Sequence, residues 1–118
     1  MTIESWQEQL RRGGLELAIL LAVASSPRYG LAIIRHLEEY TDLVVTEGTV
    51  YPILARLTRD GALLAQWVAD EGPHPRKYYR LTDRGEQELA SQRRQWQVVD
   101  STLRGTLFRS FQLVLQGG

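Results

Sequence analysis

Hydroxyl and basic residues gather in two short stretches of the chain, and both residue types bind phosphate groups. One stretch covers residues 46–56 and the other is the pair Arg76-Lys77. Hydroxyls donate hydrogen bonds to phosphate oxygens, arginine pairs with phosphates and guanine edges, and Gly48 lets a backbone come close to a ligand. Helix capping and an ordinary solvated surface are the alternative explanation. The predicted DNA-binding residues are Tyr29, Thr46, Gly48, Thr49, Tyr51, Arg56, Arg76 and Lys77.

The residue types give no indication of disulfide, metal-binding or catalytic chemistry. The chain has no cysteine, which excludes disulfides, zinc-thiolate sites and a cysteine nucleophile. His36 and His74 are far apart in sequence, and neither a Gly-x-Ser-x-Gly elbow nor a Walker loop is present. We therefore expect no catalytic residue, no metal site, no cofactor and no enzymatic activity.

The charge balance requires that any DNA-binding surface arise from local sorting of charge. Fourteen basic residues face fourteen acidic ones, so the net charge is zero. Many nucleic-acid-binding domains are instead strongly basic. Leu17–Ala24, the most apolar run, is too short to span a membrane. The expected location is the cytoplasm.

The three tryptophans suggest a second surface. Trp96 lies midway along a predicted long helix, where it would fill a dimer core or stack on a flat aromatic ligand. Trp67 is expected to pack a hairpin against the core. The residues predicted for a dimer or effector interface are Trp6, Trp96, Val99 and Leu103.

Periodicity and turn residues predict helices over residues 5–25, 29–40 and 46–60, then strands over 63–68 and 76–81. A last helix begins after Thr82 and runs to about residue 109 or beyond. The position of Pro52 is compatible with two different first residues for the third helix. With Thr46 as the cap, Pro52 kinks the helix, whereas with Thr49 it falls in the tolerated first turn.

This order predicts a mainly α fold with a small β-hairpin, an α+β arrangement. It is that of a winged helix-turn-helix, in which the third helix enters the major groove and the hairpin, or wing, lies beside it. The long last helix would then serve for dimerisation. We expect residues 1–82 to form the DNA-binding domain and residues 83–118 to form the C-terminal dimerisation helix.

Four stretches match the motifs of one family. Leu10–Leu20 is similar to a basic-Gly-Thr-Leu-Asp-Leu run, with Gly14 where threonine is commoner, and Pro27–Leu31 is similar to Pro-x-Tyr-Gly-Tyr. Glu47–Leu57 is close to Gly-Thr-Leu-Tyr-Pro-x-Leu-x-Arg-Leu, and Pro75–Gly85 to Arg-Lys-Tyr-Tyr-x-Leu-Thr-x-x-Gly. With all four in order, the chain resembles the PadR family of transcriptional regulators, in its short subgroup with one C-terminal helix.

The resemblance implies a homodimer that binds double-stranded DNA and represses a nearby operon, often until a small molecule relieves it. Some members of the short subgroup bind flat aromatic compounds between the two dimer helices. Two other functions remain open at this point. One is a winged-helix protein-interaction module without DNA binding, and the other is a ligand carrier built around Trp96.

Overall fold

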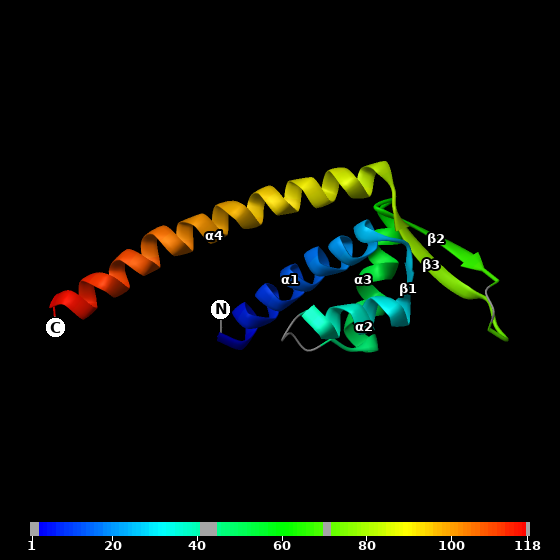
Figure 1. Cartoon of the computed structure of the whole chain (residues 1–118), viewed down its shortest axis with the longest axis horizontal. Coiled ribbons are helices and arrows are strands. Elements are labelled where there is room, and N and C mark those ends of the chain that lie inside the picture. The colour runs from blue at the N-terminus through cyan, green and yellow to red at the C-terminus, as the bar shows by residue number, and fades with distance from the viewer. Residues whose placement is uncertain (1–2, 41–44, 70–71, 118) are drawn as a thin grey trace.

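The computed structural model describes the backbone of residues 3–40, 45–69 and 72–117, and side chains within 12–39, 45–69 and 72–105. Three helices and a hairpin form a body from which one long helix extends, and the molecule is 65 Å long (Figure 1). In chain order the elements are α1 (Ile3–Ser25), β1 (Arg28–Tyr29), α2 (Gly30–Tyr40), α3 (Glu47–Arg59), β2 (Leu63–Val68), β3 (Arg76–Leu81) and α4 (Asp83–Gly117).

Local hydrogen bonds and one left-handed glycine define both ends of α3 and the start of α4. Thr46 is the N-cap of α3, so that Pro52 lies inside the helix, and the backbone N–H of Thr46 donates to Thr49 Oγ1 at 3.2 Å. Gly61 follows the C-cap with a φ of 83°, a left-handed conformation that favours glycine. Thr82 Oγ1 accepts the N–H of Gly85 at 3.0 Å, which confirms Thr82 as the cap of α4.

The sheet has one strand more than the sequence predicted. The hairpin strands Leu63–Val68 and Arg76–Leu81 are confirmed, and they pair antiparallel from Leu63 opposite Leu81 to Val68 opposite Arg76. Residues 28–29 were not expected to form a strand, and the helix was expected to start at Tyr29. They instead pair with Tyr78 and Tyr79 on the other edge of β3, and a two-residue strand has no periodicity to reveal it.

The core lies where α1, α2 and α3 meet the base of the sheet. Its fully buried side chains include Leu15, Ile19, Leu20, Ile33, Val50, Leu54 and Leu63. The fold is mostly helical, with four helices and a three-stranded antiparallel sheet, which confirms the predicted winged helix-turn-helix class.

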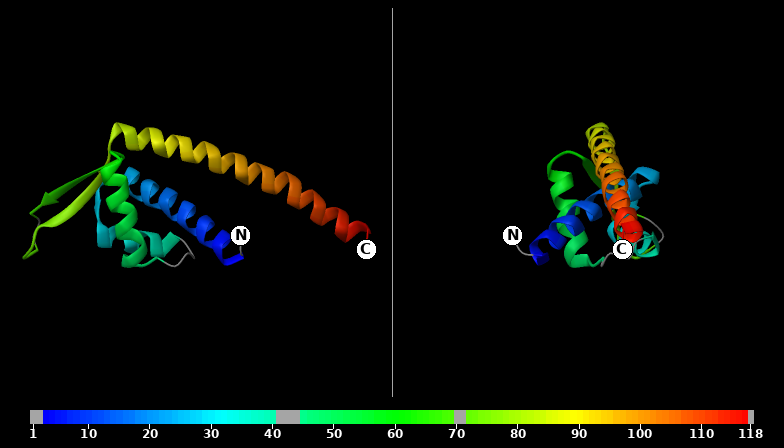
Figure 2. Two further views of the ribbon diagram at one scale, coloured as in Figure 1. Left: turned by 180° about the vertical axis from the view of Figure 1, so that it is seen from behind. Right: turned by 90° about the vertical axis from the view of Figure 1, so that its left-hand side faces the viewer.

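The contacts of α4 with the body, as far as its side chains are described, lie in its first half, from Gly85 to Trp96. Seen from behind, α1 and α4 lie together beside the sheet and diverge toward the two chain ends (Figure 2). Gly105 does not end the helix, which continues to Gly117. None of the helices in the described ranges is long and apolar enough to cross a membrane.

Candidate nucleic-acid interface

One side of α3 packs into the core and the other is exposed. Val50, Ile53, Leu54 and Leu57 are buried on the inner side. The exposed residues of α3 are Glu47, Gly48, Thr49, Tyr51, Pro52, Ala55 and Arg59. Apart from Glu47 in the first turn, this helix face presents small, hydroxyl and basic residues to a groove of DNA.

The hydroxyls at the start of α3 are engaged with each other and with the backbone. Thr49 Oγ1 donates to the carbonyl oxygen of Thr46 at 2.9 Å, and the two threonine hydroxyls lie 3.2 Å apart. Both residues remain exposed. The pair therefore shapes the first turn of α3, and its surface can still meet a phosphate.

Arg56 differs from the other predicted contacts, because its guanidinium is held by acidic groups of the protein. Arg56 Nη2 donates to Glu16 Oε2 on α1 at 2.7 Å, and Nη1 lies 3.8 Å from Asp60 Oδ2. The Arg56 side chain is 39% exposed and that of Glu16 only 17%. The predicted DNA contact of Arg56 therefore competes with an ion pair already present in the structure.

The base of the wing brings Tyr29 and Arg76 together. The Arg76 guanidinium carbon lies 4.4 Å above the centre of the Tyr29 ring, which is a cation–π geometry. The Tyr29 ring also meets the edge of Tyr78, with ring centres 5.5 Å apart. On the opposite face of β3, Lys77 Nζ lies 5.9 Å from the centre of the Tyr79 ring.

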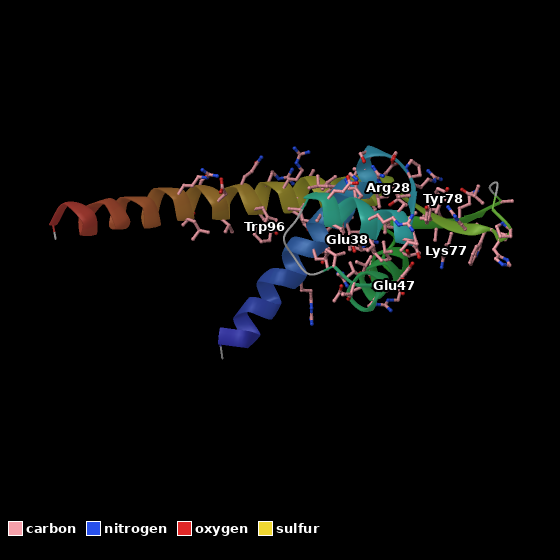
Figure 3. All side chains as sticks on the ribbon, turned by 60° about the horizontal axis from the view of Figure 1, so that its bottom comes forward. Arg28, Glu38, Glu47, Lys77, Tyr78 and Trp96 are labelled. Atoms are coloured by element: carbon pink, nitrogen blue, oxygen red, sulfur yellow. The ribbon has the colours of Figure 1, made fainter. Side chains whose placement is uncertain are left out.

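A cleft of about 560 Å³ opens between the wing and the first turns of α2 and α3. We call it the wing cleft, and its lining includes Tyr29, Arg35, Tyr51, Trp67, Arg76 and Lys77. Four of these six are predicted DNA contacts from three separate segments. Figure 3 shows Lys77 on the wing and Glu47 in the first turn of α3, both remote from the free end of α4.

Two tyrosines, the exposed Tyr51 and the buried Tyr79, shape the lining of the wing cleft. A Cβ added to Gly30 would lie 2.5 Å from Tyr51 Cε1, so the Tyr51 ring can hold this position only because residue 30 is glycine and has no side chain. Burial raises the pKa of the Tyr79 phenol, and the nearby Tyr51 raises it further. Both effects keep the Tyr79 phenol neutral.

The expectation for Trp67 is wrong. It was expected to pack the wing against the core, yet its side chain is 68% exposed. On β2 only Leu63 is buried and Ala65 partly buried, and Trp67 is two residues farther along the strand, beyond the helical body. Arg35, on the outward side of α2, also lines the wing cleft and was not among the predicted contacts.

Three of the four residues predicted for a dimer or effector interface, Trp96, Val99 and Leu103, fall on one stripe of α4. The Trp96 ring packs over Gly13 of α1, since a Cβ on Gly13 would lie 3.7 Å from Trp96 Cζ2. Val99 and Leu103 continue the same stripe and are exposed. The side chain of Trp6 lies outside the described residues. In the described ranges, no group of three histidine or carboxylate residues could hold a metal ion.

Comparison with known proteins gives one consistent family. Residues 19–91 match the model of the transcriptional regulator PadR-like family. A PadR-like transcription factor from Bacteroides fragilis is 39% identical, with a TM-score of 0.73 over 86% of this chain and 97% of that one. A PadR family regulator from Eggerthella lenta is 34% identical, with a TM-score of 0.71 over 89% of this chain and 88% of that one.

A PadR-like regulator from Bacillus cereus is 31% identical, with a TM-score of 0.76 over 84% of this chain and 96% of that one. An uncharacterised protein from Lysinibacillus sphaericus is 29% identical over 102 residues, which are 80% of this chain and 92% of that protein. The chain therefore belongs to the PadR-like family of transcriptional regulators, as its four sequence motifs predicted.

Proposed function

We propose that the protein is a homodimeric repressor that binds a pseudo-palindromic operator in the cytoplasm. The observation that carries the proposal is the convergence of the exposed face of α3 with the wing cations. Tyr29, Tyr51, Arg76 and Lys77 come from three segments and line one cleft. That cleft adjoins the helix that a winged helix-turn-helix inserts into the major groove.

The dimer in this proposal forms through the C-terminal helix, residues 83–118, while residues 1–82 bind DNA. Trp96, Val99 and Leu103 form an apolar stripe, and the part of it beyond Trp96 is exposed along a helix that leaves the body. A second copy of the chain would cover that stripe. Two recognition helices would then meet successive major grooves about one helical turn apart.

A flat aromatic effector near Trp96 would relieve repression. Trp96 is partly buried and packs over Gly13 of α1, so it lies between α1 and α4. A ligand that bound there would change the angle of α4 to the body only if it preferred one dimer geometry over another. Such a change would alter the spacing of the two wings.

Fluorescence anisotropy of labelled DNA tests the proposal. The duplex comes from just upstream of the protein's own coding region and is titrated at several salt concentrations beside a scrambled duplex. We expect preferential binding that weakens steeply with salt. Arg76→Ala with Lys77→Ala removes two cations from each protomer of the proposed dimer, so it should reduce the slope of log affinity against log salt by about 4.

Arg94→Ala is the matched control, because Arg94 is an exposed arginine on α4, away from the wing cleft. It should leave the affinity and the slope unchanged. Equal and feeble binding to the two duplexes, and to a pool of random duplexes after rounds of selection, would contradict the proposal. It would favour a protein-interaction module, which the zero net charge also suits.

A further inference from the structure

Trp67 is the most exposed of the large apolar side chains in the described part of the chain, at 68%. An indole left in water forgoes the free energy that burial of its large apolar surface would provide. Leu31 and Tyr51, which line the same cleft as Trp67, are also exposed, and contiguous exposed apolar surface often marks a place where a partner binds. Trp67 lies on the wing of a DNA-binding fold, so its partner should be sought on that side of the molecule.

The strand register places Trp67 over the wing cleft. Trp67 is directly opposite Lys77, and side chains of directly paired residues share one face of a sheet. Two residues closer to the body, the same face carries Ala65 and Tyr79, and Tyr79 is buried. The indole and the Lys77 ammonium therefore overhang the cleft from one side. Arg35 and Tyr51 approach from the helices on the other side.

The charge of the lining identifies the chemistry of the occupant. Three basic residues, Arg35, Arg76 and Lys77, line the wing cleft, and none of the described residues in its lining is an aspartate or a glutamate. This concentration of positive charge occurs in a chain whose net charge is zero. The cations stand beside flat aromatic surfaces. A deoxyribose–phosphate chain has the matching alternation, because its sugars are largely apolar and its phosphates are anionic.

We propose that the wing cleft holds one strand of the DNA backbone, with the Trp67 indole packed on a deoxyribose and Lys77 and Arg35 on the flanking phosphates. The inference rests on the proposed function and adds to it a contact that is independent of base sequence. Trp67 then contributes affinity for any duplex, and the exposed face of α3 contributes the preference for the operator.

Tryptophan fluorescence tests the contact directly. Trp6→Phe with Trp96→Phe leaves Trp67 as the only tryptophan, and Trp6→Phe with Trp67→Phe leaves Trp96 as the matched control. Saturating duplex should reduce acrylamide quenching of Trp67 about threefold or more, because the contact removes the indole from solvent. Quenching of Trp96 should not change. Circular dichroism establishes beforehand that both variants are folded.

Binding measurements on Trp67→Ala in the otherwise natural chain give a second test. Affinity should fall about tenfold for operator and scrambled duplex alike, with the salt slope unchanged, since an apolar contact releases no counterions. Arg35→Ala removes one cation from each protomer and should instead lower the salt slope of the dimer by about 2. Trp67→Phe should recover part of the affinity.

Four outcomes would overturn the inference. If duplex binds at saturation while Trp67 stays fully quenchable, the contact is absent and the proposed function stands. If Trp67→Ala weakens only operator binding, the indole reads bases and does not hold the backbone. If benzoate protects Trp67 and duplex does not, the cleft is a small-molecule site. A failure of every duplex to bind would defeat the inference and the proposed function together.

Discussion

Gly85 and Gly105 lie in the same helix but in opposite surroundings. A Cβ on Gly85 would overlap the carbonyl oxygen of Ala62, which also accepts the backbone N–H of Thr82 at 3.1 Å. We expect Gly85→Ala to push the start of α4 away from β2 and to lower the free energy of unfolding by about 2 kcal/mol. Thermal unfolding at a fixed protein concentration measures the change.

Gly105→Ala is the matched control for this prediction. Nothing lies within 4 Å of a Cβ at Gly105, and the residue is in a helix interior. Alanine should therefore raise the free energy of unfolding by about 0.5–1 kcal/mol, because it restricts the unfolded chain and favours the helix. Equal effects of the two substitutions would mean that the contact between α4 and Ala62 is not tight.

Tyr79 should make stability depend on pH in the alkaline range. Its pKa in the folded protein is raised above the usual 10.0 because the phenol is buried. The phenol therefore ionises more readily in the unfolded chain, and the stability it contributes below pH 10 is lost as the pH rises toward the folded pKa. Urea unfolding from pH 8 to pH 11 should show the wild type losing stability relative to Tyr79→Phe above pH 10. A constant difference across that range would contradict the prediction.

Site residues could be predicted where the controlling contacts are local in sequence. Thr82 acts within a few residues of itself, and its role as the cap of α4 follows from residue type and spacing. For α3 the sequence left Thr46 and Thr49 as alternatives, and the structure has Thr46 as the cap. The environment of Arg56 could not be predicted, because its partner Glu16 is 40 residues away. Trp67 was placed wrongly because alternation along a strand gives the face but not where the helical body ends.

Three helices are linked through the carboxylate of Glu16. Oε2 accepts from Arg56 of α3 at 2.7 Å, and Oε1 accepts from Gln92 Nε2 of α4 at 3.1 Å. Gln92 also donates to Glu88 at 3.0 Å. The helix proposed to read DNA is thus tied, through α1, to the helix proposed to form the dimer.

We expect Glu16→Gln to lower the free energy of unfolding by about 1 kcal/mol, because the Glu16–Arg56 pair is charged and partly sheltered from water. In a double-mutant cycle with Arg56→Gln, the coupling energy should also be about 1 kcal/mol. Chemical denaturation of the four proteins gives the result.

The Arg104–Asp100 pair on α4 provides the comparison for that cycle. Arg104 Nε donates to both carboxylate oxygens of Asp100 at 2.9 Å, but the Arg104 side chain is 79% exposed and that of Asp100 is 60% exposed. Arg104→Gln should change the stability by only a few tenths of a kcal/mol, since water screens exposed pairs. A coupling energy near zero between Glu16 and Arg56 would show that their ion pair does not stabilise the contact between α1 and α3.

At the scale of secondary structure, the long elements were predictable and the shortest was not. Helices α2 and α3 and both wing strands lie within a residue or so of the predicted ranges, because each buries a periodic apolar face. Strand β1 forms only because α2 docks beside β3, which is a tertiary cause. The full length of α4 was also left open, since a glycine weakens a helix but seldom decides whether it ends.

For the molecule as a whole, the charge that matters is its distribution. A net charge of zero gives no overall attraction to DNA, yet three basic residues meet at the wing cleft, where none of the described lining residues is acidic. Arg35 and Lys77 are 42 residues apart in the chain, and Arg76 is next to Lys77. The sequence shows that these basic residues are present, but it does not predict that they come together at one cleft. The winged helix-turn-helix places them on one side, where a polyanion would meet them together.

The shape of the molecule leads to a last prediction, about assembly. Val99 and Leu103 share a stripe with Trp96, whereas the exposed Val98 is 100° away from Val99 around the helix axis, on the side away from that stripe. Val99→Asp with Leu103→Asp should convert a dimer to a monomer, because it buries two carboxylates in an apolar interface. Sedimentation should then give the mass of one chain in place of two. Operator affinity should fall about 100-fold, since the half-sites would no longer be bound together.

Val98→Asp separates an interface from a general effect of charge on α4. It adds an aspartate one residue away and should leave both the mass and the operator affinity unchanged. If the double variant remained a dimer with full affinity, the stripe would not be the interface. If it became a monomer that still bound the operator as tightly, dimerisation and DNA binding would be independent. Dissociation by all the aspartate variants would instead mean that α4 as a whole, and not one face of it, holds the two chains together.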